Sequence, residues 1–253
     1  MTTDACAAIV QRADSDRFAA IMAAPVAARA RLFALFAFNI EVARAPWATT
    51  EPLIAQMRLQ WWQDAIEEIA AGKAPRKHEV VGPLAAVIAG LPLAPFKALI
   101  AARQWDIYPE PFADLPEFLT HMDHTSGGLL WLAALALGAE PAHEPLVRGI
   151  GVAAGIANWL TAAPELAARG RVPLVDDSEA ALRELALHGL GLLAAAQGTD
   201  FGPAVPALRT CWRAEALLTQ VRHDPSRVAA GLLGTSEFQR RSSLMWRAFS
   251  GRW

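Results

Sequence analysis

Apolar side chains along this chain recur mainly at intervals of three and four residues, which is the spacing of one face of an α-helix. Proline, glycine and aspartate punctuate the pattern, and no alternating run is long enough to be a strand. The predicted helices cover Arg29–Val42, Pro52 to a stop at Gly72, Val80–Ala89, Ala94–Asp106, Leu115–Leu137, Glu144–Ala168, Ser178–Ala196, Val205–Gln220 and Ser236–Phe249. No break is long or polar enough for a domain linker, so we predict a single all-α domain over residues 1–253.

Composition narrows the class of protein. Hydrophobic residues make up 54% of the 253 residues, which is apolar without being the composition of a membrane bundle. The longest uncharged run, Gly149–Pro164, holds roughly 16 residues and falls short of a bilayer span, so we expect no transmembrane helix. A net charge of -2 gives no bias toward nucleic acid. The acidic N-terminal stretch does not resemble a targeting peptide, which predicts a cytoplasmic protein.

The two cysteines, Cys6 and Cys211, match neither a disulfide framework nor a metal-binding spacing. We expect both to be reduced thiols.

The last predicted helix, within residues 236–253, is basic and amphipathic. Over residues 240–253 four arginines alternate with leucine, methionine, phenylalanine and tryptophan. This composition is typical of a helix that contacts a membrane surface or of a helix that enters a partner's groove. In the first case we expect a peripheral contact with the inner membrane. A last helix docked on the core, with arginines near its negative end, explains the same pattern. The sequence leaves these alternatives open.

Two regions carry a resemblance to a known family. Residues 149–175 read GIGVAAGIANWLTAAPELAARGRVPLV, and residues 33–47 read FALFAFNIEVARAPW. Both resemble signature segments of the squalene/phytoene synthase family. The resemblance implies an isoprenoid-synthase-like helical bundle with a central cavity. It also implies that catalytic relatives use acidic residues on two facing helices to hold magnesium and a diphosphate.

This chain departs from the family pattern where the metal ligands belong. The matching positions in the first segment are Ala43, Arg44 and Trp47, and in the second they are Ala162 and Leu166. Magnesium needs hard oxygen ligands in near-octahedral geometry. We therefore predict no metal site, no catalytic residue and no cofactor.

The chain more nearly resembles a divergent branch of the family, which includes a mitochondrial complex I assembly factor. The shared patterns are FN-x-E-x-A at residues 38–43 and R-x-Q-x-W at residues 58–62. The resemblance implies a non-catalytic bacterial protein of complex I assembly, which binds a complex I subunit or an isoprenoid-like lipid. The alternative is an active prenyltransferase of the phytoene or squalene synthase type, which joins two prenyl diphosphates head to head and uses magnesium.

The resemblance and the position of polar residues select candidates for the cavity. We expect the arginines to neutralise an anion, the amides to line the cavity and one carboxylate to remain there. The candidate cavity and anion-binding residues are Asn39, Glu41, Arg44, Gln60, Asn158, Arg169 and Arg171.

Two further patterns have structural explanations. His121 and His124 lie three residues apart on one predicted helix face, but a zinc site needs more ligands than are visible, so we interpret them as a polar rim at a helix start. Gly149, Gly151 and Gly155 lack the spacing of a dinucleotide fingerprint, and we expect them to let a neighbouring helix approach closely.

Overall fold

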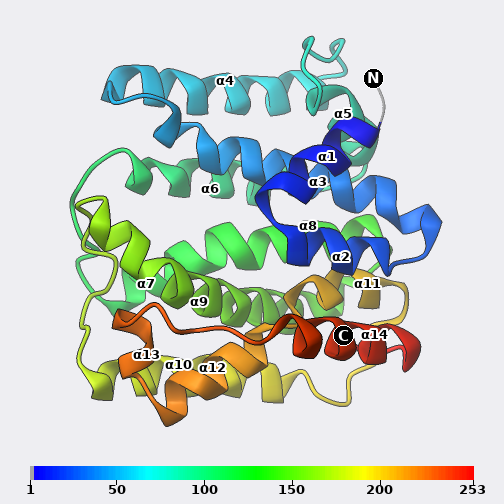
Figure 1. The fold of residues 1–253 in the computed structure, drawn as a ribbon. Coiled ribbons are helices and arrows are strands. Elements are labelled where there is room, and N and C mark those ends of the chain that lie inside the picture. The colour runs from blue at the N-terminus through cyan, green and yellow to red at the C-terminus, as the bar shows by residue number, and fades with distance from the viewer. Residues whose placement is uncertain (1–2) are drawn as a thin grey trace.

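The computed structural model describes residues 3–253, and within that range the chain forms helices and loops without a strand. The helices stack in layers, with α4 outermost on one side and α10 and α12 on the other (Figure 1). The α-helices are α1 Thr3–Ala13, α2 Ser15–Met22, α3 Val26–Arg44, α4 Pro52–Ala70, α5 Val81–Ile88, α6 Leu93–Ala102, α7 Leu115–Met122, α8 Gly128–Ala136, α9 Glu144–Ala168, α10 Glu179–Ala195, α11 Val205–Leu208, α12 Ala214–His223, α13 Ser226–Ala229 and α14 Glu237–Phe249. The predicted all-α bundle is confirmed.

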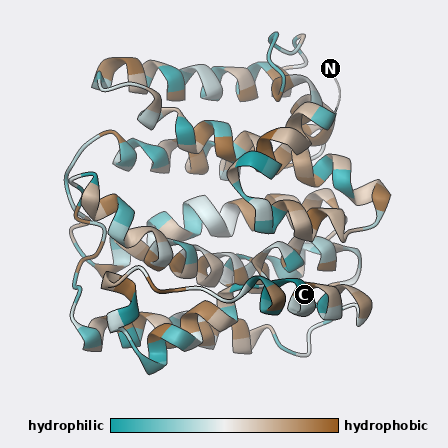
Figure 2. Ribbon diagram, in the orientation of Figure 1, coloured by the Kyte–Doolittle hydropathy of each residue, from teal (hydrophilic) through white to brown (hydrophobic). Residues whose placement is uncertain are grey.

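The middle layer consists of helices that are apolar on nearly every side. Residues 32–40 of α3 are all buried, and so are residues 128–134 of α8. A helix that is hydrophobic all round has to be covered on all sides. Here α3 packs against α1, α5 and α8, while α8 also packs against α9. The outer helices carry the hydrophilic residues along their exposed faces (Figure 2).

The first two helices, α1 and α2, were not predicted from the sequence. Both are short and amphipathic, and they meet at Asp14, whose carboxylate accepts a hydrogen bond from the backbone N–H of Arg17 at 2.8 Å and so caps α2. Elsewhere one predicted helix, Leu115–Leu137, contains a π-helical turn at Asp123–Gly127 between α7 and α8. Another, Val205–Gln220, is divided into α11, a 3-10 turn and α12.

Small residues on α9 allow its close approach to the π-helical turn, as the sequence predicted. A Cβ atom added at Gly151 would lie 2.6 Å from the carbonyl oxygen of Ser126, and one at Gly155 would lie 2.7 Å from Ser126 Oγ. Both distances are shorter than a side chain tolerates. At Gly149 the nearest atom, on Leu192, is 3.5 Å away, which is ordinary contact. The close packing therefore depends on two of the three glycines.

The segment Pro141–Ala168, which contains α9, is long and apolar enough to span a membrane by length and composition. No such helix was expected from the sequence, because the uncharged run between Arg148 and Glu165 holds only roughly 16 residues. In the fold 61% of its most apolar window is buried. Its hydrophobicity is that of a central helix covered by α8, α10 and α12.

Candidate functional site

A cavity of about 410 Å³ lies between α3, α8 and α9 near the centre of the bundle. Its volume is in the range of small-molecule binding sites. The apolar part of its wall consists of Phe36, Ala43, Trp47, Met122, Leu129, Leu130, Ala154, Trp159, Ala162 and Leu166. Thr125 and Ser126, from the π-helical turn, add hydroxyl groups to the wall. The site combines an apolar wall with a few polar groups, as ligand sites usually do.

Four of the five positions that the family resemblance assigns to metal-binding acids lie in this wall. Ala43 comes from α3, Trp47 from the turn after it, and Ala162 and Leu166 from α9. None of these side chains offers an oxygen atom to a cation. The fifth, Arg44, is directed away from the cavity. The residues therefore do not fit the magnesium cluster that the family resemblance implies.

The three carboxylates that line the cavity are each paired with an arginine that also lines it. Asp14 lies 3.3 Å from Arg17, and Glu165 lies 2.5 Å from Arg169. Asp106 lies 3.5 Å from Arg103. Within residues 3–253 no three histidine, cysteine, aspartate or glutamate side chains gather where they could hold a metal ion. The negative and positive side chains of the cavity wall therefore neutralise one another in pairs.

Asp106 is the most buried of these acids, with 5% of its surface exposed. Burial raises the pKa of its carboxyl group above the usual value, although the nearby Arg103 and Arg171 oppose that shift. Its Oδ2 atom accepts no hydrogen bond within the described chain. Sequence reasoning missed the pair, although an arginine and an aspartate three residues apart after an apolar helix were a usable signal.

Three of the sequence-predicted site residues lie at the cavity: Asn39, Asn158 and Arg169. Asn39 is 9% exposed, and its Oδ1 atom has no hydrogen-bond partner within the described residues. A buried amide without a partner is uncommon, because leaving it unpaired costs free energy. Asn39 is therefore placed to meet a polar group of a ligand, and its binding role stays a prediction.

Arg171 does not line the cavity, contrary to the sequence-based expectation. Its guanidinium group donates hydrogen bonds to the backbone carbonyls of Asp106 and Tyr108. It also lies over the ring of Trp47 at 5.1 Å, and Arg169 lies over the same ring at 5.3 Å. Two nitrogen atoms of Arg171 therefore tie the loop after α9 to the 3-10 turn after α6.

Glu41 and Arg44 also lie outside the cavity. The cavity face of α3 carries Asn39 and Ala43, whereas Glu41 and Arg44 face the opposite side and form an ion pair at 3.4 Å. That side borders a second depression of about 580 Å³, which α4 completes with Met57, among others. Because an α-helix has 3.6 residues per turn, positions 41 and 44 lie on one face of α3, and positions 39 and 43 lie on the face that meets the cavity.

Gln60 is the fourth candidate that the structure places elsewhere. It is exposed on α4, where its side-chain amide donates a hydrogen bond to Asp64 at 2.7 Å. Helix α4 is an outer layer, so only the face with Ala55, Leu59 and Trp62 is buried. The sequence pattern showed that α4 is amphipathic but not that another helix separates it from the cavity.

His121 is buried rather than part of a polar rim at a helix start, which corrects the sequence interpretation. Only 7% of its surface is exposed, and its ring lies among the aromatic side chains of Trp105, Phe112 and Trp159. Burial lowers its pKa from 6.5 to about 3. Its neighbour Asp123 is paired with Arg148 rather than with an imidazole.

Comparison with known families matches residues 10–230 to Squalene/phytoene synthase. Among curated proteins, the chain is 26% identical over 174 residues to NADH dehydrogenase (ubiquinone) complex I, assembly factor 6, from Homo sapiens, covering 68% of this chain and 52% of the relative. It is 28% identical over 193 residues to the homolog from Drosophila melanogaster, covering 73% of this chain and 56% of the relative. The chain thus spans about half the length of these relatives.

Among solved structures, a dehydrosqualene synthase in complex with a ligand superposes with a TM-score of 0.82 at 15% identity, covering 98% of this chain and 95% of that one. A squalene synthase from Alicyclobacillus acidocaldarius gives a TM-score of 0.62 at 19% identity, covering 98% and 89%. At these identities the likeness concerns the fold, and it confirms the isoprenoid-synthase-like bundle expected from the sequence.

Proposed function

Because this chain belongs to the squalene/phytoene synthase family but has no oxygen ligand at the family's metal positions in the cavity wall, we propose that it is a non-catalytic binding protein of respiratory complex I assembly. The observation that carries this proposal is the identity of Ala43, Trp47, Ala162 and Leu166, which line the cavity where the enzymes need acids.

A prenyltransferase has to stabilise the negative charge of its diphosphate leaving group. Ionising an allylic diphosphate separates charge, and bridging cations stabilise the departing anion. Such electrostatic stabilisation usually contributes more to catalysis than any other single effect. In this cavity each arginine that could replace a cation is already paired with a carboxylate. The wall therefore offers little net positive charge to a leaving diphosphate.

The names of the curated relatives support a role in complex I assembly. The curated proteins that resemble this chain carry names of complex I assembly factors from a mammal and an insect. In our proposal the chain contributes to assembly by binding a complex I subunit, while the cavity holds an apolar ligand such as an isoprenoid-like lipid. Asn39 would hydrogen-bond the polar end of that ligand, and the apolar wall would cover its chain.

The first experiment separates binding from catalysis. Purified protein is incubated with farnesyl or geranylgeranyl diphosphate and Mg²⁺, beside a dehydrosqualene synthase as the positive control. We expect no head-to-head product from this chain. Turnover that increases with its concentration would show an active prenyltransferase, and the proposal would be abandoned.

The second experiment tests the process and the role of the cavity. The gene is deleted in the host, and assembled NADH dehydrogenase is measured by native gel electrophoresis and activity staining. We expect assembly to fall and to return with the wild-type gene, but not with Ala154→Phe, which fills the cavity at a buried wall position. Ala194→Phe, the same substitution at an exposed position of α10 outside the cavity wall, serves as the matched variant and should restore assembly. Normal assembly in the deletion strain would refute the proposed process.

A further inference from the structure

Helix α14 carries its large apolar side chains on the outside of the protein. Phe238 is 80% exposed, Met245 is 70% exposed and Phe249 is 87% exposed. Intervals of seven and four residues place these three on one stripe of the helix. Trp246, beside the stripe, is also exposed. We call these four residues the outer face of α14.

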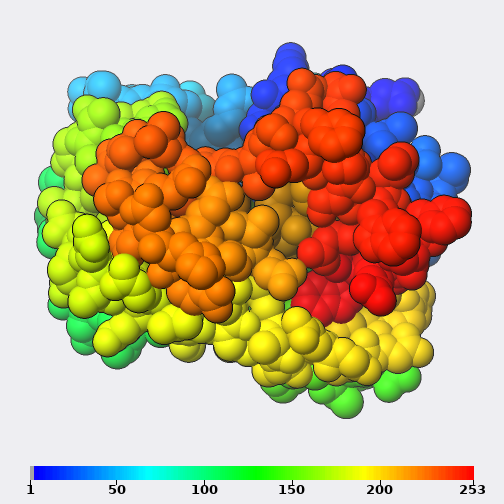
Figure 3. Space-filling view, turned by 60° about the horizontal axis from the view of Figure 1, so that its bottom comes forward, coloured from blue at the N-terminus to red at the C-terminus, as the bar shows by residue number. Residues whose placement is uncertain are grey.

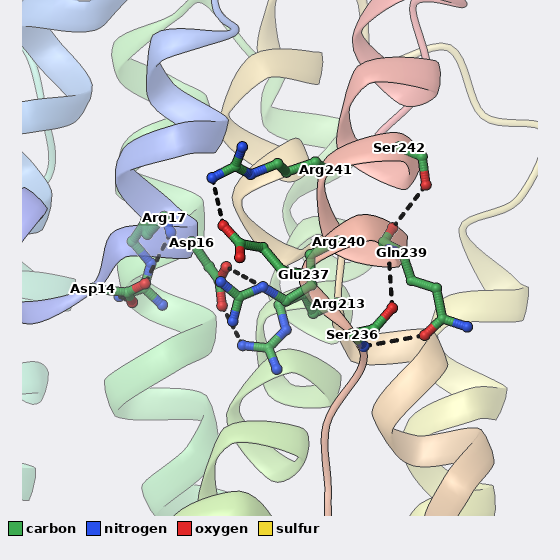
Figure 4. Close-up of polar contacts among 10 residues, drawn as sticks. All are labelled: Asp14, Asp16, Arg17, Arg213, Ser236, Glu237, Gln239, Arg240, Arg241 and Ser242. Atoms are coloured by element: carbon green, nitrogen blue, oxygen red, sulfur yellow. Dashed lines mark hydrogen bonds and ion pairs between the residues drawn. The ribbon is translucent and has the colours of Figure 1, made fainter.

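The opposite face of α14 is held to the protein mainly by ion pairs. Arg240 pairs with Asp16 of α2 at 3.3 Å, and Arg247 pairs with Glu215 of α12 at 3.3 Å (Figure 4 shows the first pair). The one buried apolar residue of the helix, Leu244, packs with Ala20 and Trp212. These contacts fix the rotation of the helix about its axis, so the outer face does not turn toward the core.

This arrangement reverses the usual distribution of side chains on a surface helix. An amphipathic helix in water normally directs its apolar stripe inward, because burial of apolar surface is favourable. A capping box between Ser236 and Gln239 begins α14 and stabilises it locally (Figure 4). The aromatic side chains of this well-formed helix are exposed in the isolated protein, which indicates that a second surface covers them when the protein binds.

We propose that the outer face of α14 docks on a lipid bilayer that contains anionic headgroups. The segment 236–253 holds four arginines and a single acidic residue, Glu237, although the whole chain has a net charge of -2. Arginine attracts anionic lipid headgroups, and phenylalanine and tryptophan insert at the boundary between headgroups and acyl chains. The C-terminal segment, red in Figure 3, spreads over the outer surface of the molecule, where it can meet a flat bilayer.

A second copy of the chain fits this face less well than a bilayer does. Self-association through α14 would bring two arginine-rich segments together, and like charges repel one another. Of these arginines, Arg241 is 80% exposed at its side chain, and its ion pair with Glu237 is solvent-screened, so an anionic headgroup can compete for it. The charge and the composition of the face favour lipid, and this inference does not depend on the proposed role in complex I assembly.

The test measures how the full chain sediments with vesicles. Vesicles of phosphatidylglycerol and phosphatidylcholine are compared with vesicles of phosphatidylcholine alone. We expect the protein to sediment with the anionic vesicles, and less so at high salt. The triple variant Phe238→Ser, Met245→Ser, Phe249→Ser should weaken binding about tenfold or more, because its apolar side chains no longer insert. Arg241→Gln should weaken it about fivefold.

The matched control removes three exposed apolar residues from another surface. Leu53→Ser, Ile54→Ser, Met57→Ser changes α4, where these side chains are 68%, 44% and 63% exposed. We expect this variant to bind vesicles as the wild type does, and both triple variants to keep the wild-type melting temperature. Three outcomes would overturn the proposal: no binding of the wild type to anionic vesicles, equal loss in both triple variants, or a concentration-dependent dimer that the α14 variant abolishes while vesicles have no effect.

Discussion

His121 shows how burial changes the chemistry of a single side chain in this protein. In the sequence it stands beside Asp123 and His124, in a context that favours an exposed polar position. The fold instead places its ring against Trp105, Phe112 and Trp159, where a positive charge has little water to solvate it. The imidazole is therefore held neutral, and its Nε2 atom has no hydrogen-bond partner within the described residues.

The neutral state of His121 predicts a loss of stability in acid. Its pKa falls from 6.5 to about 3 on folding, so between these values the unfolded chain binds a proton that the folded chain does not. Stability should therefore decrease as the pH falls below about 6.5, by at most about 1.4 kcal/mol per pH unit from this residue. We expect His121→Phe to reduce the difference between the free energies of unfolding at pH 7.5 and pH 5 by about 2 kcal/mol.

Urea denaturation at the two pH values measures this difference. His188→Gln, at an exposed position, is the control for the loss of a histidine and should leave the difference unchanged. An unaltered difference in the His121→Phe variant would show that the imidazole is not held neutral by the fold.

Cys6 provides a second prediction at the residue scale. Its thiol is fully buried, and burial raises the pKa of that thiol to about 11. The thiolate, which is the reactive form, should be scarce at neutral pH. We expect Cys6 to react with a disulfide reagent at pH 8 only after unfolding by urea, as read by mass spectrometry of the labelled peptide. Rapid labelling of Cys6 in the native protein would contradict this prediction.

At the scale of elements, the contact between α9 and the π-helical turn at Asp123–Gly127 forms one wall of the cavity. Gly151 lets α9 lie directly against the backbone of Ser126 and Gly127, and Gly155 lets it lie against the side chain of Ser126. Both glycines line the cavity, so the same small side chains set its width. The extra residue of the π-helical turn offsets the register between α7 and α8 and directs Thr125 and Ser126 toward the cavity.

Alanine substitutions test this contact. Gly151→Ala places a Cβ atom 2.6 Å from a backbone oxygen that cannot move independently, so we expect a loss of about 2 kcal/mol in the free energy of unfolding. Gly191→Ala, in α10, meets nothing within 4 Å and should stabilise the protein by about 0.5–1 kcal/mol, since alanine is the better helix former. Chemical denaturation of the two variants provides the measurement, and equal shifts in the same direction would contradict the proposed contact.

On the scale of the whole molecule, Asp16 connects the two ends of the chain. Its carboxylate pairs with Arg213, just before α12, and with Arg240 of α14, so α2 holds two segments from the far end of the sequence (Figure 4). The side chain of Asp16 is 18% exposed, so solvent screens these pairs only in part. Helix α2 thereby fixes which face of α14 is presented outward.

Asp16→Asn should loosen α14. The change leaves Arg213 and Arg240 without a counter-charge, and we expect a loss of about 1–2 kcal/mol together with faster proteolysis within residues 236–253. Limited digestion with trypsin followed by mass spectrometry measures the rate. Glu237→Gln breaks only the highly exposed pair with Arg241 and should leave the digestion rate near that of the wild type. If both variants were digested equally fast, Asp16 would not be the link between the termini.

The candidate site could be predicted only in part. The family signature correctly placed Ala43, Trp47, Ala162 and Leu166 at the cavity, because these positions match those that the resemblance assigns to metal ligands. Periodicity showed that α3 and α4 are helices but not which of their faces meets the cavity, so Glu41, Arg44 and Gln60 were misplaced. The Arg103–Asp106 pair was missed, because two neighbouring opposite charges resemble an ordinary solvated pair until a cavity is seen beside them.

By itself, the sequence determined the helical character of this protein, the ends of α9, the family and the loss of acids at the metal positions. These properties follow from local spacing and residue identity, which operate within a few turns of one chain segment. Only the tertiary structure decided that the cavity arginines are neutralised by carboxylates, that His121 is buried, and that α14 directs its aromatic side chains toward solvent. Those properties depend on the distance between segments far apart in the chain, and spacing along one segment does not specify that distance.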